Sequence, residues 1–290
     1  MIPFLRRTML MTPGNRRERL HKAVSTSADS VVFDLEDSIP PDQKLHARKI
    51  VAETLTAIVT SQKEVCVRIN GLDTPFGDDD IKHIPWRLID SVMLPKIESS
   101  EQLLDIQKRL DRTSGLIGRH GPLELIVMLE TPRGILNAMP IADCSEYATA
   151  LFFGSGDYTS AMSAEICEAV LQYPRSVVCA AAAAAGKQAI DAAYFLQVKD
   201  AEATGVDAQI ARRFGFSGKV VFHPNQIDVV NEVFSPTLHE IEHARKIVDA
   251  YENAKASGIG TLVVDGHFVA VDLVPPAQRL LMKGKRLGII

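Results

Sequence analysis

The chain of 290 residues has no long apolar run, which argues against a membrane-spanning helix. Its most apolar stretch free of charge extends only from Ser176 to Gly186, whereas a helix needs about 20 apolar residues to cross a bilayer. No apolar segment follows Arg6 and Arg7, so we expect no secretory signal. The sequence therefore predicts a cytoplasmic protein that does not bind a membrane.

The sequence also lacks the usual signals for several kinds of partner. Its 32 Lys and Arg stand against 36 Asp and Glu, whereas nucleic-acid binders usually carry a basic excess, so no nucleic-acid partner is expected. The four cysteines form no Cys-x-x-Cys pair, which is typical of thiols in a reducing compartment. There is no Walker loop and no Gly-x-Gly-x-x-Gly after a strand, so nucleotide hydrolysis and dinucleotide redox chemistry have no motif support.

The sequence does contain an alternation of strand-like and helix-like segments. Eight apolar runs end in polar or turn residues at intervals of roughly 30 residues, the length of one βα unit. This pattern predicts an α/β fold, a (β/α)8 barrel of the TIM type, although an open doubly wound sheet stays possible because closure cannot be read from sequence. The predicted strands are Thr8–Pro13, Ser30–Asp37, Glu64–Gly71, Asp90–Ile97, Leu123–Thr131, Ala148–Asp157, Ala189–Phe195 and Gly218–Pro224.

We expect the barrel in residues 1–234 and a C-terminal tail in residues 235–290. The tail is too small to be stable alone, so it should pack on the barrel or on a neighbouring subunit, as a lid and an oligomer contact. Its expected elements are an exposed amphipathic helix, a hairpin around an Asp-Gly turn and a terminal helix opened by two prolines: Ser235–Ser257, Leu262–Val271 and the segment from Pro275 onward.

Charged residues gather at the predicted C-terminal ends of the strands, where TIM barrels carry their active sites. Carboxylates at one mouth repel each other and raise each other's pKa unless a cation lies among them. Oxygen ligands without His or Cys favour Mg²⁺, and an arginine beside them suits a substrate carboxylate. Helix capping or ion pairs at the rim would also explain each residue singly. The residues concerned are Asp34, Glu36, Asp37, Arg68, Asn70, Lys96, Glu130 and Asp157.

Two other chemistries have weaker support. Lys96 could be the Schiff-base lysine of a metal-free aldolase, but neighbouring carboxylates would keep its amine protonated, so a paired or substrate-orienting ammonium fits better. The segment from His239 to His243 matches the His-Glu-x-x-His pattern of zinc hydrolases. It lies in a charged tail helix without an obvious third ligand, so we interpret it as a solvated helix face.

Basic residues cluster near the first two predicted strands. A phosphate-bearing ligand across that part of the mouth would explain them, and ordinary helix-surface charge would explain most of them singly. The cluster contains Arg6, Arg7, Arg16, Arg17, Arg19, Lys22, Lys44 and Arg48.

A series of motifs, in order, resembles the citrate lyase β-subunit family, within the HpcH/HpaI-type aldolases that include malyl-CoA and citramalyl-CoA lyases. The resemblance covers nearly the whole chain, and the order of the motifs makes it specific. The motifs are Leu5-Arg-Arg-Thr-Met-Leu-Met-Thr-Pro-Gly14, Ala28-Asp-Ser-Val-Val-Phe-Asp-Leu-Glu-Asp-Ser38, Val67-Arg-Ile-Asn70, Leu94-Pro-Lys96, Leu129-Glu-Thr131, Gly154-Ser-Gly-Asp157, Pro174-Arg-Ser176, Ala189-Ile-Asp191 and Gly218-Lys-Val-Val-Phe-His-Pro-Asn-Gln-Ile227.

The resemblance implies roles for the strand-end residues. Glu130 and Asp157 would be direct Mg²⁺ ligands, and Glu36 and Asp37 would hold metal-bound water. Arg68 would bind the carboxylate of the oxo-acid part of the substrate, beside Glu130.

The resemblance also implies a CoA or acyl-carrier thioester, with Arg7, Lys44 and Arg48 near its phosphates. Members of the family are usually homotrimers or hexamers whose tail reaches across a subunit boundary.

One position departs from the family pattern. The catalytic aspartate of the CoA lyases lies in a tail motif that aligns here with Gly266-His-Phe-Val-Ala270, so an alanine stands in its place. Asp272 follows two residues later, on the same face if the strand continues, and would be displaced by about 6.6 Å. Asp272 can replace that aspartate only if the tail is bulged or shifted, and it is the provisional acid/base on that condition. The alternatives are that another base serves or that the chemistry is different or weakened.

The expected activity is Mg²⁺-dependent cleavage of a 3-hydroxyacyl-CoA into acetyl-CoA and a 2-oxo acid. Citramalyl-CoA, malyl-CoA and citryl thioesters differ by one substituent, and we favour citramalyl-CoA. One alternative is a CoA-independent class II aldolase acting on hydroxy-oxo acids. The other is a citrate-lyase-type subunit that works with an acyl-carrier or transferase partner.

Overall fold

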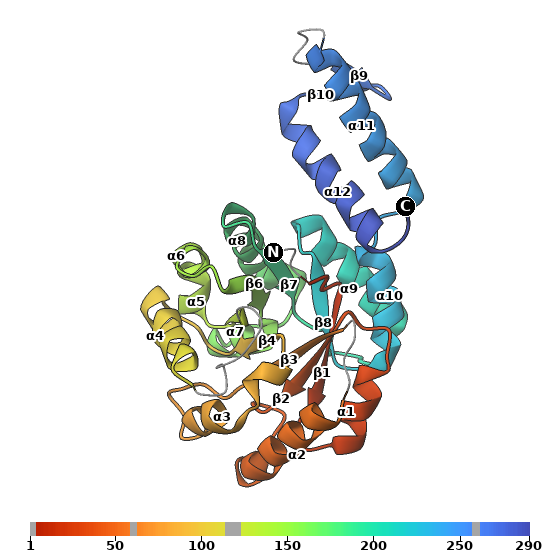
Figure 1. Ribbon diagram of the computed structural model, residues 1–290. Helices are drawn as coiled ribbons and strands as arrows, with labels where there is room; N and C mark the ends of the chain where they lie inside the picture. Colours follow the sequence, from red (N-terminus) through yellow and green to blue (C-terminus); the bar gives the residue numbers. More distant parts are fainter. Residues whose placement is uncertain (1–3, 59–62, 114–122, 257–261) are drawn as a thin grey trace. The chain divides into compact units, whose positions relative to one another are not determined.

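The computed structural model describes residues 4–58, 63–113, 123–256 and 262–290. Eight parallel strands form a closed barrel in sequence order, with β1 paired to β2 on one side and to β8 on the other (Figure 1). The (β/α)8 prediction is confirmed, and the open sheet is excluded. The strands are β1 Thr8–Pro13, β2 Ser30–Asp34, β3 Glu64–Arg68, β4 Ser91–Leu94, β5 Glu124–Leu129, β6 Ala148–Phe153, β7 Gln188–Asp191 and β8 Gly218–Val221.

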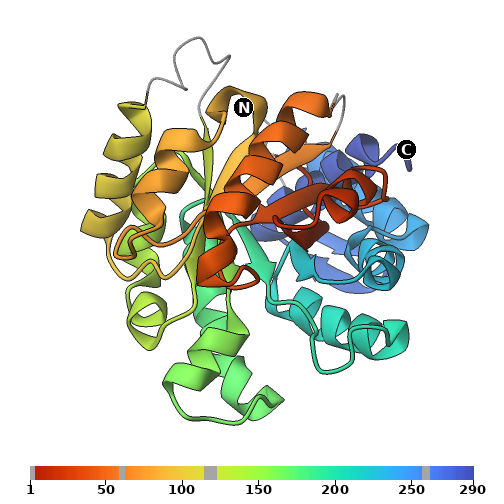
Figure 2. The same ribbon diagram turned by 90° about the horizontal axis from the view of Figure 1, so that it is seen from below.

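The barrel strands are buried on both faces, as their continuous apolar runs predict. All residues of β2 and β5 are buried. One set of side chains forms an apolar cluster with members from all eight strands, among them Met9, Val32, Ile126 and Val220. Helices surround the strands (Figure 2), as they must when neither face of a parallel sheet meets water.

The helices of this part include the three that helical spacing predicts, at Asp42–Thr60, Glu101–Asp111 and Ala201–Arg213, although Thr60 lies outside the described residues. No helix of the described residues is long and apolar enough to cross a membrane. The helices are α1 Arg17–Val24, α2 Lys44–Ala57, α3 Gly77–His83, α4 Ser100–Asp111, α5 Pro132–Leu136, α6 Ala138–Asp143, α7 Ser155–Ala161, α8 Glu168–Ala184, α9 Ala201–Phe214 and α10 Ile227–Phe234, with 3-10 turns at η1 Pro41–Gln43, η2 Trp86–Leu88 and η4 Pro224–Gln226.

Most of the strands end earlier than predicted, because their last residues belong to the loops that follow. β2 stops at Asp34 rather than Asp37, and β6 stops at Phe153 rather than Asp157. The charged residues Glu36, Lys96 and Glu130 therefore lie on loops at the C-terminal ends of the strands, where the backbone is free to direct them inward.

The opposite ends of the strands carry a buried polar group that we call the N-terminal cluster. The Arg6 guanidinium donates to both Glu64 and Glu124. Ser91 adds a hydrogen bond to Glu64, and Thr149 adds one to Glu124. Arg6 and Glu64 have fully buried side chains, so this cluster closes the bottom of the barrel.

The chain divides into two compact units, residues Met1–Asn231 and Glu232–Ile290. The second unit contains α11 Leu238–Ala256, β9 Leu262–Val264, β10 His267–Val269, η5 Val271–Leu273 and α12 Val274–Arg286. Its small core contains Ala244, Ile247, Val264, Val269 and Ala277.

The predicted hairpin is present in this second unit, with β9 antiparallel to β10. Asp265 and Gly266 both have positive φ, 48° and 81°, as a two-residue type I′ turn requires. The predicted amphipathic helix corresponds to α11, and its last predicted residue, Ser257, lies outside the described residues. Prolines stand in the first turn of α12, as expected.

Candidate active site

A cavity of about 530 Å³ opens at the C-terminal ends of the barrel strands. One part of its lining is charged and contains Asp34, Asp37, Arg68, Glu130 and Asp157. The other part is apolar and contains Met11, Met128, Phe152, Ala192, Ala193 and Phe195. These residues come from six different βα units, and the charged ones come from four of them, so the structure brings them together as the strand-end pattern predicts.

Arg68 is held rigidly at the base of this cavity by Asp34. The two residues are neighbours in the register of β2 and β3. Arg68 Nε donates to Asp34 Oδ1 at 2.6 Å, and Nη2 donates to Oδ2 at 2.8 Å, which is the bidentate geometry of a strong charge-assisted pair. Burial opposes ionisation of Asp34, but the Arg68 guanidinium outweighs it and lowers the pKa of this carboxyl.

The same aspartate also organises the loop that follows β2. Asp34 accepts hydrogen bonds from the backbone N–H of Glu36 at 2.9 Å and of Ser38 at 3.1 Å, and from the Ser38 hydroxyl. Glu36 is thereby turned toward Arg68, whose Nη1 lies 2.8 Å from Glu36 Oε2, and Asp37 Oδ2 lies 3.5 Å from the same Nη1. One buried carboxylate therefore positions the arginine and both loop carboxylates together.

Glu130 lies in the buried wall of the cavity, with 3% of its surface exposed. Its burial, together with the charges of Glu36 and Asp157, raises the pKa of Glu130 to about 8. Gly154 leaves the room that Glu130 needs, because a Cβ at this position would lie 2.4 Å from the Glu130 Cβ. The Lys96 backbone N–H donates to Glu130 Oε1 at 2.9 Å and holds it in place.

Asp157 stands in the first turn of α7 and is 42% exposed as a side chain, yet its Oδ2 atom is buried without a hydrogen-bond partner. Glu36 Oε2 is likewise buried without a hydrogen bond, although it pairs with Arg68. Such carboxylate oxygens are available to a cation. The oxygen-only donor set suits Mg²⁺, which typically takes one or two protein carboxylates and completes its shell with water and substrate.

The carboxylates at the mouth do not form a complete metal site made of protein ligands alone. Among the described residues, no group of three His, Cys, Asp or Glu side chains is arranged to hold a metal by itself. The residues fit a magnesium ion bound by a carboxylate pair, Glu130 and Asp157, with room left for water and substrate oxygens.

Lys96 lies among the same carboxylates as a paired ammonium. Its Nζ is 2.9 Å from Glu36 Oε1, 3.7 Å from Asp37 Oδ1 and 3.8 Å from Asp157 Oδ2. Partial burial opposes its charge, but the hydrogen bond and charge of Glu36 outweigh this and raise the pKa of Lys96. A nucleophilic lysine needs a lowered pKa, so the geometry disfavours the Schiff-base alternative.

The three cations predicted to contact phosphates are engaged elsewhere. Arg7 precedes β1, so it lies at the N-terminal ends of the strands, where it forms a bidentate pair with Asp29; its predicted place near the mouth is wrong. Lys44 Nζ donates to the backbone oxygens of Leu35 and Glu36. Arg48 is buried and pairs with Asp80 at 2.9 Å.

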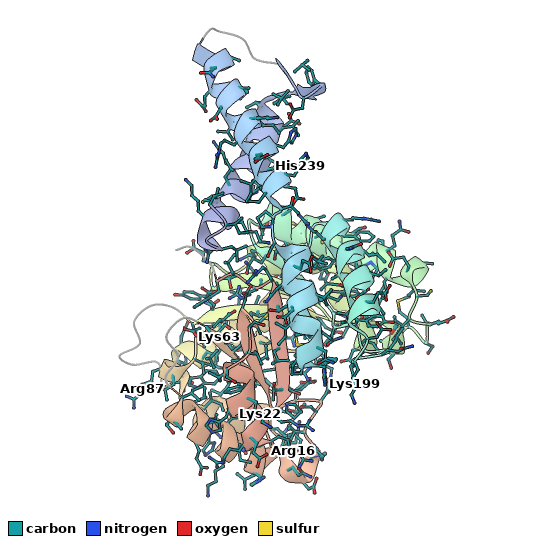
Figure 3. The ribbon with its side chains drawn as sticks, turned by 90° about the vertical axis from the view of Figure 1, so that its right-hand side faces the viewer. Arg16, Lys22, Lys63, Arg87, Lys199 and His239 are labelled. Carbon is teal, nitrogen blue, oxygen red and sulfur yellow. The ribbon has the colours of Figure 1, made fainter. Side chains whose placement is uncertain are left out.

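One other basic residue of the predicted cluster is better placed for a large ligand, because Arg19 lines the cavity and is exposed. Arg16 and Lys22 are also exposed and lie at the two ends of α1 (Figure 3). Lys22 belongs to the last turn of α1, which leads back toward the N-terminal ends of the strands.

The predicted tail aspartate does not lie on a strand. β10 ends at Val269, Ala270 caps the following turn, and Asp272 lies exposed in the 3-10 turn η5. The expectation that Asp272 keeps the face of the family's aspartate along a continuing strand is therefore wrong. The 3-10 turn η5 leads from the end of β10 into α12, whose first turn contains Pro275 and Pro276.

The His-Glu-x-x-His pattern lies on α11, where His239 is exposed (Figure 3). His243 Nδ1 lies 3.2 Å from Asp265 Oδ2 in the hairpin turn, and Lys246 Nζ is 3.0 Å from the same oxygen. These contacts join the helix to the hairpin within the second unit.

Sequence reasoning includes Asp34 and Gly154 but misses the roles that they have in the site. Asp34 is among the predicted strand-end carboxylates, but its role in holding Arg68 depends on strand register. Gly154 stands directly after β6, and a glycine at a strand end beside a carboxylate motif is the signal that could have drawn attention to it.

Comparison with known proteins places this site in a family. The sequence profile described as HpcH/HpaI aldolase/citrate lyase matches residues 7–224, the whole barrel up to the loop after β8. The chain belongs to this family. The match includes Arg68, Glu130 and Asp157 and excludes the tail.

The curated relatives carry two kinds of name. Citrate lyase subunit beta of Leuconostoc mesenteroides subsp. cremoris is 35% identical over 280 residues, covering 96% of this chain and 92% of the relative. A (3S)-malyl-CoA thioesterase of Cereibacter sphaeroides is 32% identical over 284 residues, covering 97% of this chain and 95% of the relative. The relatives that resemble this chain are therefore named for two different reactions, that of a lyase and that of a thioesterase.

A solved structure shows the same fold with ligands. Protein CitE from Mycobacterium tuberculosis, in complex with magnesium, acetoacetate and coenzyme A, has a TM-score of 0.76 and 27% sequence identity. The match covers 96% of this chain and 97% of that chain. Homology thus supports a lyase of the citrate lyase β type.

Proposed function

We propose that this protein is a magnesium-dependent carbon–carbon lyase that cleaves a 3-hydroxyacyl-CoA into acetyl-CoA and a 2-oxo acid. The observation that carries the proposal is the meeting, in one cavity, of a rigid Arg68 with the carboxylate pair Glu130 and Asp157. An arginine for a substrate carboxylate beside a magnesium site is what a 2-oxo acid product requires. The relatives' names and the magnesium and coenzyme A in a similar structure support it.

Glu130 and Asp157 would hold the magnesium ion, and Glu36 and Asp37 would hold its water. When bound, the ion supplies Lewis-acid stabilisation to the substrate's hydroxyl and carboxylate oxygens. Arg68 fixes the carboxylate in one orientation, since its other edge is locked by Asp34. The apolar wall of Met128, Phe152 and neighbouring residues excludes water from the cleavage site.

Carbon–carbon cleavage takes the proton from the substrate hydroxyl to a base as the carbonyl of the 2-oxo acid forms, and it leaves an acetyl-CoA enolate. The enolate carbon must receive one proton before acetyl-CoA departs, so the reaction has no net change in protons. We assign this step to Asp272, an exposed carboxyl of the second unit in the region where the family's catalytic aspartate occurs. The tail would then act as a lid over a barrel mouth, and a trimer or hexamer would supply its contact surface. Light scattering of the full chain tests the oligomeric state.

The apolar part of the cavity favours a small apolar substituent on the oxo-acid carbon. Met128, Phe152 and Ala193 suit the methyl of citramalyl-CoA, which yields pyruvate, better than the second carboxylate of a citryl thioester. We therefore rank citramalyl-CoA first, malyl-CoA second and citryl thioesters third.

The test is a substrate panel of citramalyl-CoA, malyl-CoA and citryl-CoA, with Mg²⁺ or with EDTA, for the wild type, Asp272→Ala and Asp249→Ala. Asp249→Ala is the matched control because it removes another exposed tail carboxylate, on α11 and away from the hairpin turn. We expect Mg²⁺-dependent acetyl-CoA release that Asp272→Ala abolishes and Asp249→Ala retains.

Other outcomes would select the alternatives. Cleavage of CoA-free hydroxy-oxo acids at the same rate would indicate a class II aldolase. A protein that binds the oxo acid but does not cleave the thioester alone, and that gains cleavage activity when an acyl-carrier or transferase subunit is added, would be a citrate-lyase-type subunit. Equal activity of the wild type and Asp272→Ala would show that another group protonates the enolate.

A further inference from the structure

Lys96 combines two unusual features at one position of the site. It is one of three non-glycine residues of the described chain with positive φ, at 52°, a left-handed conformation that disfavours side chains with a Cβ. Asp265 has its positive φ in a hairpin turn that requires it, whereas Lys96 follows β4 at the mouth of the barrel. Strain at such a place points to a functional constraint.

The left-handed backbone directs the two polar groups of Lys96 to different parts of the same site. Its N–H donates to Glu130 Oε1 at 2.9 Å. Its ammonium lies within 3.8 Å of oxygens from Glu36, Asp37 and Asp157. These three carboxylates, with Glu130, are the ones that would surround the magnesium ion and its water.

An ammonium and a divalent cation attract the same carboxylate oxygens and repel each other. We propose that the Lys96 ammonium competes with magnesium for the mouth carboxylates and so sets the magnesium affinity of the site, while its backbone N–H positions Glu130. Lys96 is thus a positioning residue with two separable parts. The inference rests on the magnesium site of the proposed function. It gives Lys96, which is not one of the proposed magnesium ligands, a role in setting the magnesium affinity.

Two substitutions separate the ammonium from the backbone conformation, and both should change the magnesium affinity in the same way. Lys96→Met keeps the side-chain length and the backbone N–H but removes the charge. Lys96→Gly also removes the charge and relieves the strain of a positive φ. Both variants should bind Mg²⁺ about tenfold more tightly than the wild type, because a unit charge close to a divalent ion opposes it strongly even with solvent screening.

The matched control is Lys82→Met, which removes an ammonium that pairs with Asp79 on α3 and does not line the cavity. Magnesium binding is measured by isothermal titration calorimetry without substrate. Thermal unfolding in EDTA and in Mg²⁺ is the second readout. Lys96→Met should lower the melting temperature in EDTA, where the carboxylates lose their counter-charge, and Mg²⁺ should restore it.

Unchanged or weaker Mg²⁺ binding by Lys96→Met overturns the inference and leaves the proposed function standing. A large difference in Mg²⁺ affinity between Lys96→Met and Lys96→Gly would show that the backbone, and not the ammonium, sets the affinity, which also overturns it. If the wild type binds no Mg²⁺, the inference and the proposed function fail together. A Lys96→Met protein that folds only with Mg²⁺ supports the competition.

Discussion

The two ends of the barrel carry clusters built from the same residue types, yet they differ in how their charges are satisfied. In the N-terminal cluster, Arg6 lies between Glu64 and Glu124, and serine, threonine and glutamine side chains complete the hydrogen bonds. At the mouth, Arg68 and Lys96 face five carboxylates, Asp34, Glu36, Asp37, Glu130 and Asp157.

The buried carboxylate oxygens that lack a hydrogen bond follow the same division. Among the described residues, the buried side-chain oxygens without a hydrogen bond include Glu36 Oε2 and Asp157 Oδ2 and none from the N-terminal cluster. The comparison teaches that a buried charged cluster indicates a functional site when its charges are unbalanced and face a cavity. A cluster whose charges and hydrogen bonds are all paired indicates a role in stability.

The largest expected effect is on stability and comes from the N-terminal cluster. Arg6→Ala leaves Glu64 and Glu124 buried without their cation, so it should reduce the free energy of unfolding by about 3–5 kcal/mol. Urea unfolding checks this. Arg17→Ala, which removes an exposed pair with Glu53, is the control and should change stability by less than about 1 kcal/mol.

The mouth should show the opposite behaviour. Glu130→Gln removes one of the two proposed magnesium ligands and a carboxyl whose charge is opposed by burial, so kcat/KM should fall by about 10³-fold while the fold remains. Steady-state kinetics and thermal unfolding measured on the same preparation check both parts. If Glu130→Gln does not fold, Glu130 is needed for the stability of the barrel, which would contradict this prediction.

The next effect sharpens the role of Asp34. Asp34→Asn retains the size of the side chain but removes the charge that pairs with Arg68, so Arg68 is held less firmly. We expect kcat/KM to fall by about 10–100-fold, mainly because KM rises. Ser38→Ala is matched, because Ser38 also donates to Asp34 but does not contact Arg68. A kcat defect with normal KM would contradict the positioning role.

The last effect concerns pH in the absence of divalent cations. A carboxyl whose pKa rises to about 8 on folding contributes stability that is fully present below its unfolded pKa and is lost as pH rises through about 8. We expect the free energy of unfolding in EDTA to fall between pH 5 and pH 8.5, with a slope of up to about 1.4 kcal/mol per pH unit. Glu130→Gln should flatten this slope, and an identical slope in that variant would disprove the assignment.

The sequence predicts the barrel well, because parallel strands buried on both faces leave long apolar runs at regular intervals. It also predicts which charged residues meet, since the C-terminal ends of all strands share one mouth. This rule alone is enough to predict that Glu130 and Asp157 lie at the mouth of the barrel.

The details that failed depend on register and chain direction. The pairing of Asp34 with Arg68 follows from their position as neighbours on β2 and β3, which no periodicity reveals. The prediction of Arg7 near the mouth fails because Arg7 precedes its strand, and strand polarity puts it at the other end. The prediction of Asp272 on a strand fails because β10 ends at Val269 and a 3-10 turn follows.

The measurement that tests the central claim most directly follows both products of citramalyl-CoA with the wild type in Mg²⁺. The account predicts pyruvate and acetyl-CoA in equal amounts, with no free CoA thiol, and no products in EDTA or with Asp157→Ala. Release of free CoA without pyruvate would mean that the site hydrolyses a thioester, and would contradict the account.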